Sequence, residues 1–274
     1  MNTTALLIGL GPLLGWGLYP TIVSKIGGKP VNQILGSTLG TLIFALVFSM
    51  SQGIHLASGM DLFLGILSGI GWAAGQIVTF YCFSLIGSSK VMPITTAFQL
   101  LAASLWGVVA LGNWTCVSAK ILGAFSLILI IVGASLTVWS EEKTPASTGL
   151  LRKVVIFLAL GAIGYWAYSA APQASNLSGQ EAFLPQAIGM LLTALIYSIV
   201  ISFKEKSKMA IFESVSYKHI ISGFFFAFAA LTYLISAQPD MNGLATGFIL
   251  SQTSVVLATL TGIWFLNQRK TKKE

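Results

Sequence analysis

Charged residues are scarce in this sequence. Only 8% of its 274 residues are Asp, Glu, Lys or Arg, whereas a soluble globular domain contains about 25%. Hydrophobic residues make up 55% of the chain, and the mean hydropathy is +0.84. This composition excludes an ordinary soluble globular protein and predicts an integral membrane protein.

Cysteines and buried ionisable groups are also few. Cys82 and Cys116 lie in or near apolar runs, so we expect buried thiols and no disulfide framework. The sequence has no cluster of His, Cys and carboxylate residues with metal-ligand spacing. Both histidines, His55 and His219, lie in loops or at helix ends, so Ser68 has no intramembrane histidine to act as its base. We therefore expect no metal or other cofactor and no enzymatic activity.

Nine apolar runs are long enough to cross a hydrocarbon core of about 30 Å as helices. They cover residues 5–23, 33–50, 62–85, 91–111, 119–139, 152–172, 182–203, 217–237 and 243–266. No basic residue precedes the first run and no small-residue cleavage site follows it, so we interpret it as a spanning helix and not a signal peptide. The expected fold is an all-α, polytopic membrane bundle. Glycine pairs such as Gly11 with Gly15 and Gly71 with Gly75 are predicted to let its helices approach closely.

The basic residues are distributed unevenly along the chain. The predicted loops after the first, third, fifth, seventh and ninth runs contain every Lys and Arg except Lys120. Basic loops favour the cytoplasmic side, which predicts an N-terminus outside the cell and a cytoplasmic end for the ninth helix. The net charge of +7 is thus a topology signal in a multi-pass plasma-membrane protein, and it does not indicate nucleic-acid binding.

Short motifs recur in the same order in the two parts of the chain. The matched pairs are GWGLY with GYWAY, NQILG with PQAIG, ILSG with IISG, and the two apolar runs that contain Gln99 and Gln252. Five runs precede the second set, so the two sets are predicted to form an inverted repeat. We divide the chain into a first five-helix repeat at 1–140, a cytoplasmic linker at 141–151 and a second repeat at 152–274. The second repeat has four visible helices, and we expect that a tenth is missing by truncation; a protein that dispenses with it is the alternative.

Neutral amides stand out inside the apolar runs, because all eight carboxylates lie in loops or at helix ends. An unsatisfied amide in hydrocarbon costs several kcal/mol, so these groups must face each other, water or a polar ligand. Aromatic residues accompany them, with Trp72 four residues before Gln76. Amides and aromatic rings suit a neutral polyhydroxylated solute, since the amides bond hydroxyls and the rings pack against C–H faces. Alternatively, the glutamines only join helices to each other.

Five segments resemble the bacterial glucose/ribose porter family of the drug/metabolite transporter superfamily, and ribose uptake proteins most of all. They are LLIGLGPLLGWGLYPTIVSKIGGKPVNQILG, SGIGWAAGQI, PITTAFQLLAASLWGVVALGNW, GYWAYSAAPQA and ATGFILSQTSVVLATLTGI. The resemblance implies ten helices in two inverted halves, alternating access around a central sugar site, import of a neutral monosaccharide and proposed coupling to protons. The positions that it assigns to the site are Trp16, Gln33, Trp72, Gln76, Gln99, Tyr168, Gln186 and Gln252.

The chain departs from the family pattern at the ends of two helices. Glucose-type relatives have a Gly-Glu pair there, and this chain has Asn113 and Gln268. The remaining carboxylates on the predicted outer face are Asp61, Glu181 and Asp240, each interpreted as a solvated charge at a helix end. A permease or exporter of another small neutral metabolite, such as glucose or an amino acid, remains the alternative function. A homodimer is a further expectation, through the peripheral helices.

Overall fold

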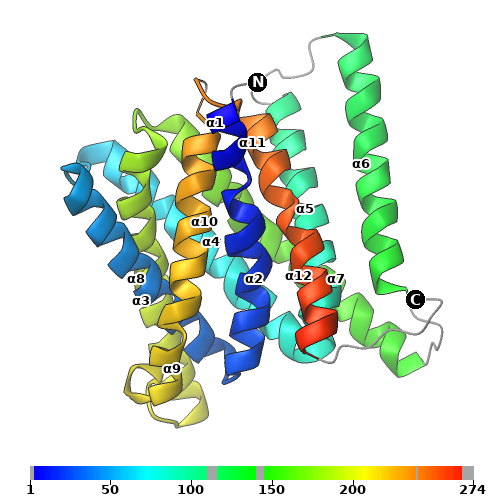
Figure 1. Cartoon of the computed structure of the whole chain (residues 1–274). Helices are drawn as coiled ribbons and strands as arrows, with labels where there is room; N and C mark the ends of the chain where they lie inside the picture. Colours follow the sequence, from blue (N-terminus) through cyan, green and yellow to red (C-terminus); the bar gives the residue numbers. More distant parts are fainter. Residues whose placement is uncertain (1–2, 110–115, 140–144, 239, 267–274) are drawn as a thin grey trace.

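The computed structural model describes residues 3–109, 116–139, 145–238 and 240–266, and these residues form helices and no strands (Figure 1). Each predicted run corresponds to one helix or to a consecutive pair. The α-helices are α1 (Thr3–Gly9), α2 (Gly11–Ile26), α3 (Pro30–Gln52), α4 (Gly59–Ile86), α5 (Ser88–Val109), α6 (Val117–Val138), α7 (Pro145–Ala170), α8 (Gly179–Glu205), α9 (Ser214–Lys218), α10 (Ile220–Ser236), α11 (Gly243–Gln252) and α12 (Ser254–Phe265). Short 3-10 turns follow α7 at Ala171–Ala174 and precede α9 at Ala210–Phe212.

Six helical segments within the described residues are long and apolar enough to cross a membrane. They are Thr3–Ile26, Pro30–Gln52, Gly59–Ile86, Thr148–Ala174, Gly179–Glu205 and Ser214–Ser236. Shorter apolar helices occur at Lys120–Gly133 and Leu250–Phe265. The protein is therefore an all-α, multi-pass membrane protein, as the composition predicts.

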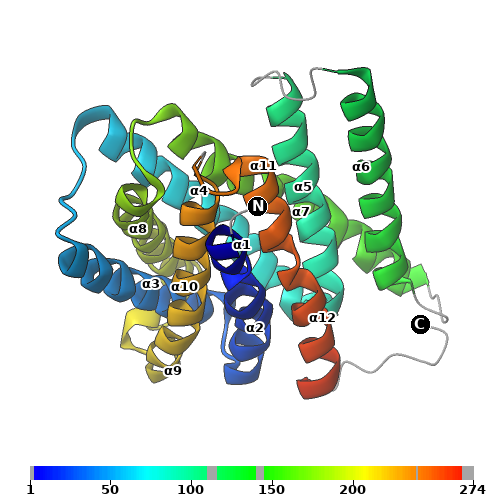
Figure 2. The same cartoon turned by 45° about the horizontal axis from the view of Figure 1, so that its top comes forward.

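Most helices pack against partners that are distant in the sequence. α4 lies against α7 and α8, α10 lies against α2 and α3, and α12 lies against α2 and α5 (Figures 1 and 2). A buried hydrogen bond of 2.7 Å between the hydroxyls of Thr21 and Thr261 joins α2 to α12. α6 is at one edge of the bundle, beside α5.

Close contacts between helices depend on glycine, as the paired glycines predict. A methyl group added to Gly15 would lie 2.5 Å from the carbonyl oxygen of Phe225 on α10, and one added to Gly71 would lie 2.6 Å from that of Gly164 on α7. No carbon atom fits at such distances. Packing of this kind brings backbones together where lipid provides no hydrophobic drive for helices to associate.

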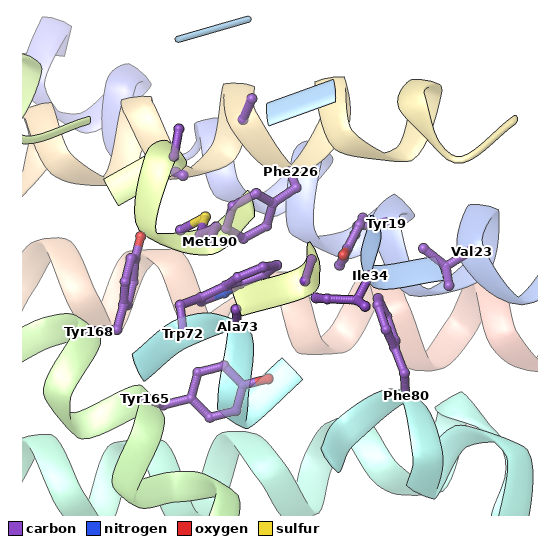
Figure 3. Packing of buried hydrophobic residues seen from close by; sticks show 14 of the residues in the cluster. Tyr19, Val23, Ile34, Trp72, Ala73, Phe80, Tyr165, Tyr168, Met190 and Phe226 are labelled. Carbon is purple, nitrogen blue, oxygen red and sulfur yellow. The ribbon is translucent and has the colours of Figure 1, made fainter. Parts of the chain in front are cut away.

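Aromatic side chains fill the centre of the bundle (Figure 3). The ring centroids of Trp72 and Phe226 are 4.1 Å apart, and Tyr19 is 5.6 Å from Phe226 and 5.9 Å from Phe80. These rings come from α2, α4 and α10, so the core joins elements from both predicted repeats.

Polar side chains connect the α2–α3 turn to the region around α9. Asn32 Nδ2 donates to Glu213 Oε2 at 2.7 Å, and a ring nitrogen of His219 lies 2.9 Å from the Gly27 carbonyl oxygen. Lys29 Nζ pairs with the Glu205 carboxylate at 2.5 Å, which raises the pKa of this exposed lysine. His219 is at the junction of α9 and α10, and its side chain is fully buried.

Three expectations need correction or delimitation. Cys82 is buried as expected, but Cys116 is exposed because it directly precedes α6, which packs mainly on α5. α7 begins at Pro145, so residues 145–151 of the expected linker belong to a helix; proline is well tolerated in a first turn, where its missing N–H would have no partner. Asn113 and Gln268, which mark the departures from the family pattern, lie outside the described residues.

Candidate substrate site

A cavity of about 70 Å³ lies among the central helices. It is several times larger than the roughly 10–15 Å³ that one water molecule requires. Its lining comes from α2, α4, α5 and α7, and from α10, α11 and α12. Both predicted repeats therefore contribute to the same enclosed space.

Six of the eight predicted site residues line this cavity. They are Trp16, Trp72, Gln76, Gln99, Tyr168 and Gln252. The aromatic pairs Trp16 with Tyr19 and Tyr165 with Tyr168 also line it, one pair on each of two helices that the repeat matches.

Gln33 and Gln186 do not line the cavity. Gln33 is at the start of α3, and its Nε2 is 3.4 Å from the carbonyl oxygen of Gly28. Gln186 Nε2 donates to Ser68 Oγ at 2.9 Å, and Ser68 Oγ donates to the Tyr168 carbonyl oxygen at 2.7 Å. Gln186 thus lies behind the wall of the cavity, where it supports the backbone of a lining residue.

Three buried donors in the wall lack a partner among the described residues. They are the indole nitrogen of Trp16 and the phenol oxygens of Tyr19 and Tyr168. Buried polar groups are nearly always hydrogen-bonded, to protein or to a bound molecule. The three groups therefore favour a polar occupant for the cavity.

Three amides surround the cavity, and each is held by a neighbour. Gln76 Oε1 accepts from the hydroxyl of Tyr165 at 2.8 Å. Gln99 Nε2 donates to Thr95 Oγ1 at 3.4 Å, and Gln252 Nε2 donates to Ser251 Oγ at 3.1 Å. Each amide keeps hydrogen-bonding capacity that these bonds do not use.

The last described apolar segment is interrupted beside the cavity. α11 ends at Gln252 and α12 begins at Ser254, and both of these residues line the cavity. At the interruption the Thr253 N–H bonds to the Leu250 carbonyl oxygen and the Val256 N–H to that of Thr253, which are the tighter bonds of a 3-10 turn. Interrupted helices commonly form the substrate sites of transporters.

None of the described residues that line the cavity is charged. A charged solute would leave its hydration shell here without a counter-ion, at a large cost in free energy. The described part of the chain also contains no group of three or more His, Cys, Asp or Glu side chains that could hold a metal ion. Neutral hydrogen bonds and ring contacts are the chemistry that the cavity offers.

Several lining residues are missing from the predicted set. They include the polar residues Thr79, Thr95 and Thr96 and the aromatic residues Tyr165, Trp166, Phe226 and Phe248. Phe226 lies in the sequence FFFAFAA, where Phe228 is exposed on the outer surface of the bundle. Hydropathy alone does not separate a lipid-facing phenylalanine from one that faces a cavity.

A family model described as sugar transport protein matches residues 7–274. The chain belongs to this family. A protein of Enterococcus faecalis named "Putative ribose uptake protein RbsU" is 70% identical over 274 residues, which is 100% of this chain and 93% of that protein. Proteins with the same name from Lactiplantibacillus plantarum and Staphylococcus epidermidis are 70% and 63% identical, with 100% of this chain and 93% and 92% of the relatives covered. No solved structure matches the chain. These matches confirm that, within the sugar transport family, the chain resembles proteins named as ribose uptake proteins.

Proposed function

We propose that the chain is a permease that imports ribose or a similar neutral monosaccharide through the central cavity. The observation that carries this proposal is a cavity whose described lining is uncharged and contains three amides, aromatic rings and three unpartnered donors. A sugar presents hydroxyls to the amides and C–H faces to the rings, and it brings no charge to neutralise. The names of the relatives agree with ribose as the sugar.

The proposed mechanism is alternating access between two inverted repeats. Helix contacts support the repeat, because the largest contacts of α4 have counterparts when the two halves are exchanged: α4 with α7 corresponds to α10 with α2, and α4 with α8 to α10 with α3. The bonds from Asn32 and from the Gly27 carbonyl group to the region around α9 cross between the halves. In this mechanism those bonds break when the cavity opens to the side on which they lie.

None of the described residues that line the cavity is Asp or Glu, so a proton-coupled mechanism has no carboxylate to protonate there. Asp61 Oδ1 accepts from the backbone N–H of Asn176 at 3.0 Å, and Glu181 forms a capping box with Ser178. Asp240 is exposed. Uptake of radiolabelled ribose into proteoliposomes, with and without an inward proton gradient, decides the matter: accumulation only with the gradient indicates symport, and simple equilibration indicates a facilitator.

The same assay tests the substrate class and the amides. We expect unlabelled ribose to compete and zwitterionic amino acids not to compete, since the cavity offers no counter-ion for either of their charges. Replacing Gln99 or Gln252 by alanine removes an amide from the lining, and we expect each variant to reach the membrane but to lose nearly all uptake. Gln52→Ala, at the exposed end of α3, is the matched control and is expected to retain uptake. Normal uptake by both cavity variants would remove these amides from the site, and competition by amino acids but not by sugars would contradict the proposed substrate.

A further inference from the structure

Tyr165 is placed to control which end of the Gln76 amide faces the cavity. Its side chain is buried on α7, and its hydroxyl donates to Gln76 Oε1 at 2.8 Å. Thr79 Oγ1, one turn along α4 from Gln76, lies 3.0 Å from the same phenol oxygen. The amide oxygen of Gln76 is therefore already engaged by a side chain of the protein.

The nitrogen of Gln76 is in the opposite situation. Among the described residues no hydrogen bond from Gln76 Nε2 is formed, while the side chain lines the cavity. A carboxamide is polar at both ends, so fixing its oxygen on one side turns its two N–H donors to the other. Gln76 thus presents donors to a ligand.

The other two amides are held in the reverse sense. In both Gln99 and Gln252, the nitrogen donates to a hydroxyl of the same segment, at 3.4 Å and 3.1 Å. Each amide oxygen is left to accept from a ligand. The cavity therefore has a donor on α4 and acceptors on α5 and α11, which is an arrangement that can orient a sugar ring.

We propose that Tyr165 is a positioning residue that holds Gln76 as a donor to one sugar hydroxyl, which accepts through its oxygen. This inference rests on the proposed function and adds to it a rule of specificity. At the hydroxyl that Gln76 contacts, the substrate must supply an acceptor. A fluorine atom at that position still accepts a hydrogen bond, whereas a hydrogen atom leaves the donor unpaired.

The test uses deoxy and fluorodeoxy analogues of ribose, altered at one hydroxyl at a time, as competitors of ribose uptake. At one position we expect the deoxy analogue to compete about tenfold more weakly than the fluoro analogue in the wild-type protein, because a site built to bond a hydroxyl rejects a ligand that lacks it. We call the strength of competition by the fluoro analogue, divided by that by the deoxy analogue, the fluoro-to-deoxy ratio. Tyr165→Phe keeps the ring and removes the hydroxyl, which frees the amide to turn. In this variant we expect the ratio at that position alone to fall to about three or less, and the KM for ribose to rise. Tyr81→Phe, on the exposed surface of α4, is the control and is expected to leave every ratio unchanged.

Binding of the same analogues is measured in parallel through tryptophan fluorescence, since Trp16, Trp72 and Trp166 line the cavity. If Gln76→Ala abolishes the ratio but Tyr165→Phe preserves it, the positioning role of Tyr165 is wrong. If the fluoro analogue competes as poorly as the deoxy analogue at every position, Gln76 is not a donor. A wild-type protein that neither binds nor carries ribose overturns both this inference and the proposed function, whereas one that carries ribose with unaltered ratios in Tyr165→Phe overturns the inference alone.

Discussion

Single side chains in the cavity combine hydrogen-bonding groups with aromatic surfaces. Trp16 has an unpartnered N–H, and its ring lies 5.6 Å from that of Tyr233 and 6.2 Å from that of Phe226. The surrounding rings limit how the indole can turn, so its donor has a fixed direction. Such preorganisation lowers the entropic cost of binding.

Trp16→Phe tests this donor. The variant keeps an aromatic ring and loses one N–H, and we expect the KM for ribose to rise roughly fivefold, which corresponds to about 1 kcal/mol for one neutral hydrogen bond. The control is Trp264→Phe at a position that is 66% exposed on α12, where the KM should not change. An equal rise in both variants, or none in Trp16→Phe, would show that the indole N–H does not contact the sugar.

Residue type predicts most of the candidate site. It does not predict which of the buried amides face the cavity. Gln76, Gln99 and Gln252 are conspicuous because an amide in an apolar run needs a partner. The same reasoning selects Gln33 and Gln186 equally, but the partners of their amide nitrogens lie within the protein, at the Gly28 carbonyl group and at Ser68, and their amide oxygens have no partner among the described residues. Composition shows that a partner is required and does not show whether the partner is protein or ligand. Only the packing of α3 on the α2–α3 turn and of α8 on α4 separates these cases.

The sequence predicts the positions of the helices better than it predicts the breaks within them. All nine runs are helical within the described residues, because about 20 apolar residues suffice to mark a span. The break at Leu10 has local signals, since Gly9 and Gly11 flank it and Pro12 follows. The breaks at His219 and Thr253 have neither proline nor glycine beside them, and they depend on contacts with other helices that a single run does not contain.

Gly15→Val tests how strongly helix packing depends on a small residue. The added side chain would collide with the Phe225 carbonyl group on α10, and such overpacking costs about 1–3 kcal/mol. We expect a lower apparent melting temperature in detergent. Gly133→Val on α6 makes a similar change in helix propensity where no atom lies within 4 Å of the added carbon. Equal losses of stability in the two variants would indicate that propensity, and not the contact with α10, causes the effect.

The whole molecule has an orientation that the basic loops predict and that labelling can test. In a background of Cys82→Ser and Cys116→Ser, a single cysteine is introduced at exposed positions in two loops. We expect Ser58→Cys, between α3 and α4, to react with a membrane-impermeant maleimide in intact cells. Lys208→Cys, between α8 and α9, should react only after the membrane is permeabilised. The reverse pattern would place the N-terminus in the cytoplasm, contrary to the prediction from lysine and arginine.

At this scale the inverted repeat stays a prediction that the helix contacts support. The sequence motifs establish which segments correspond, but they do not determine which pairs of helices touch. That pairing follows from the close approach of glycine-bearing faces, such as Gly71 of α4 against Gly164 of α7. A glycine pair in the sequence carries no information about which helix it meets. These faces can therefore be assigned only once the partner helix is known.

The partners of α2 have a consequence for how the protein is made. α2 packs on α10 and α12, and the Thr21 to Thr261 bond joins segments that lie 240 residues apart in the chain. Between Ile26 and Ile220, translation at about 5–20 residues per second takes roughly 10 to 40 s. Throughout that interval the glycine face of α2 is in the bilayer without its own partners, exposed to lipid and to any insertion factor nearby. Assembly of this bundle therefore requires that α2 be captured by helices made long after it, and a ribosome that stalls before α10 leaves behind an unfinished bundle without a complete cavity.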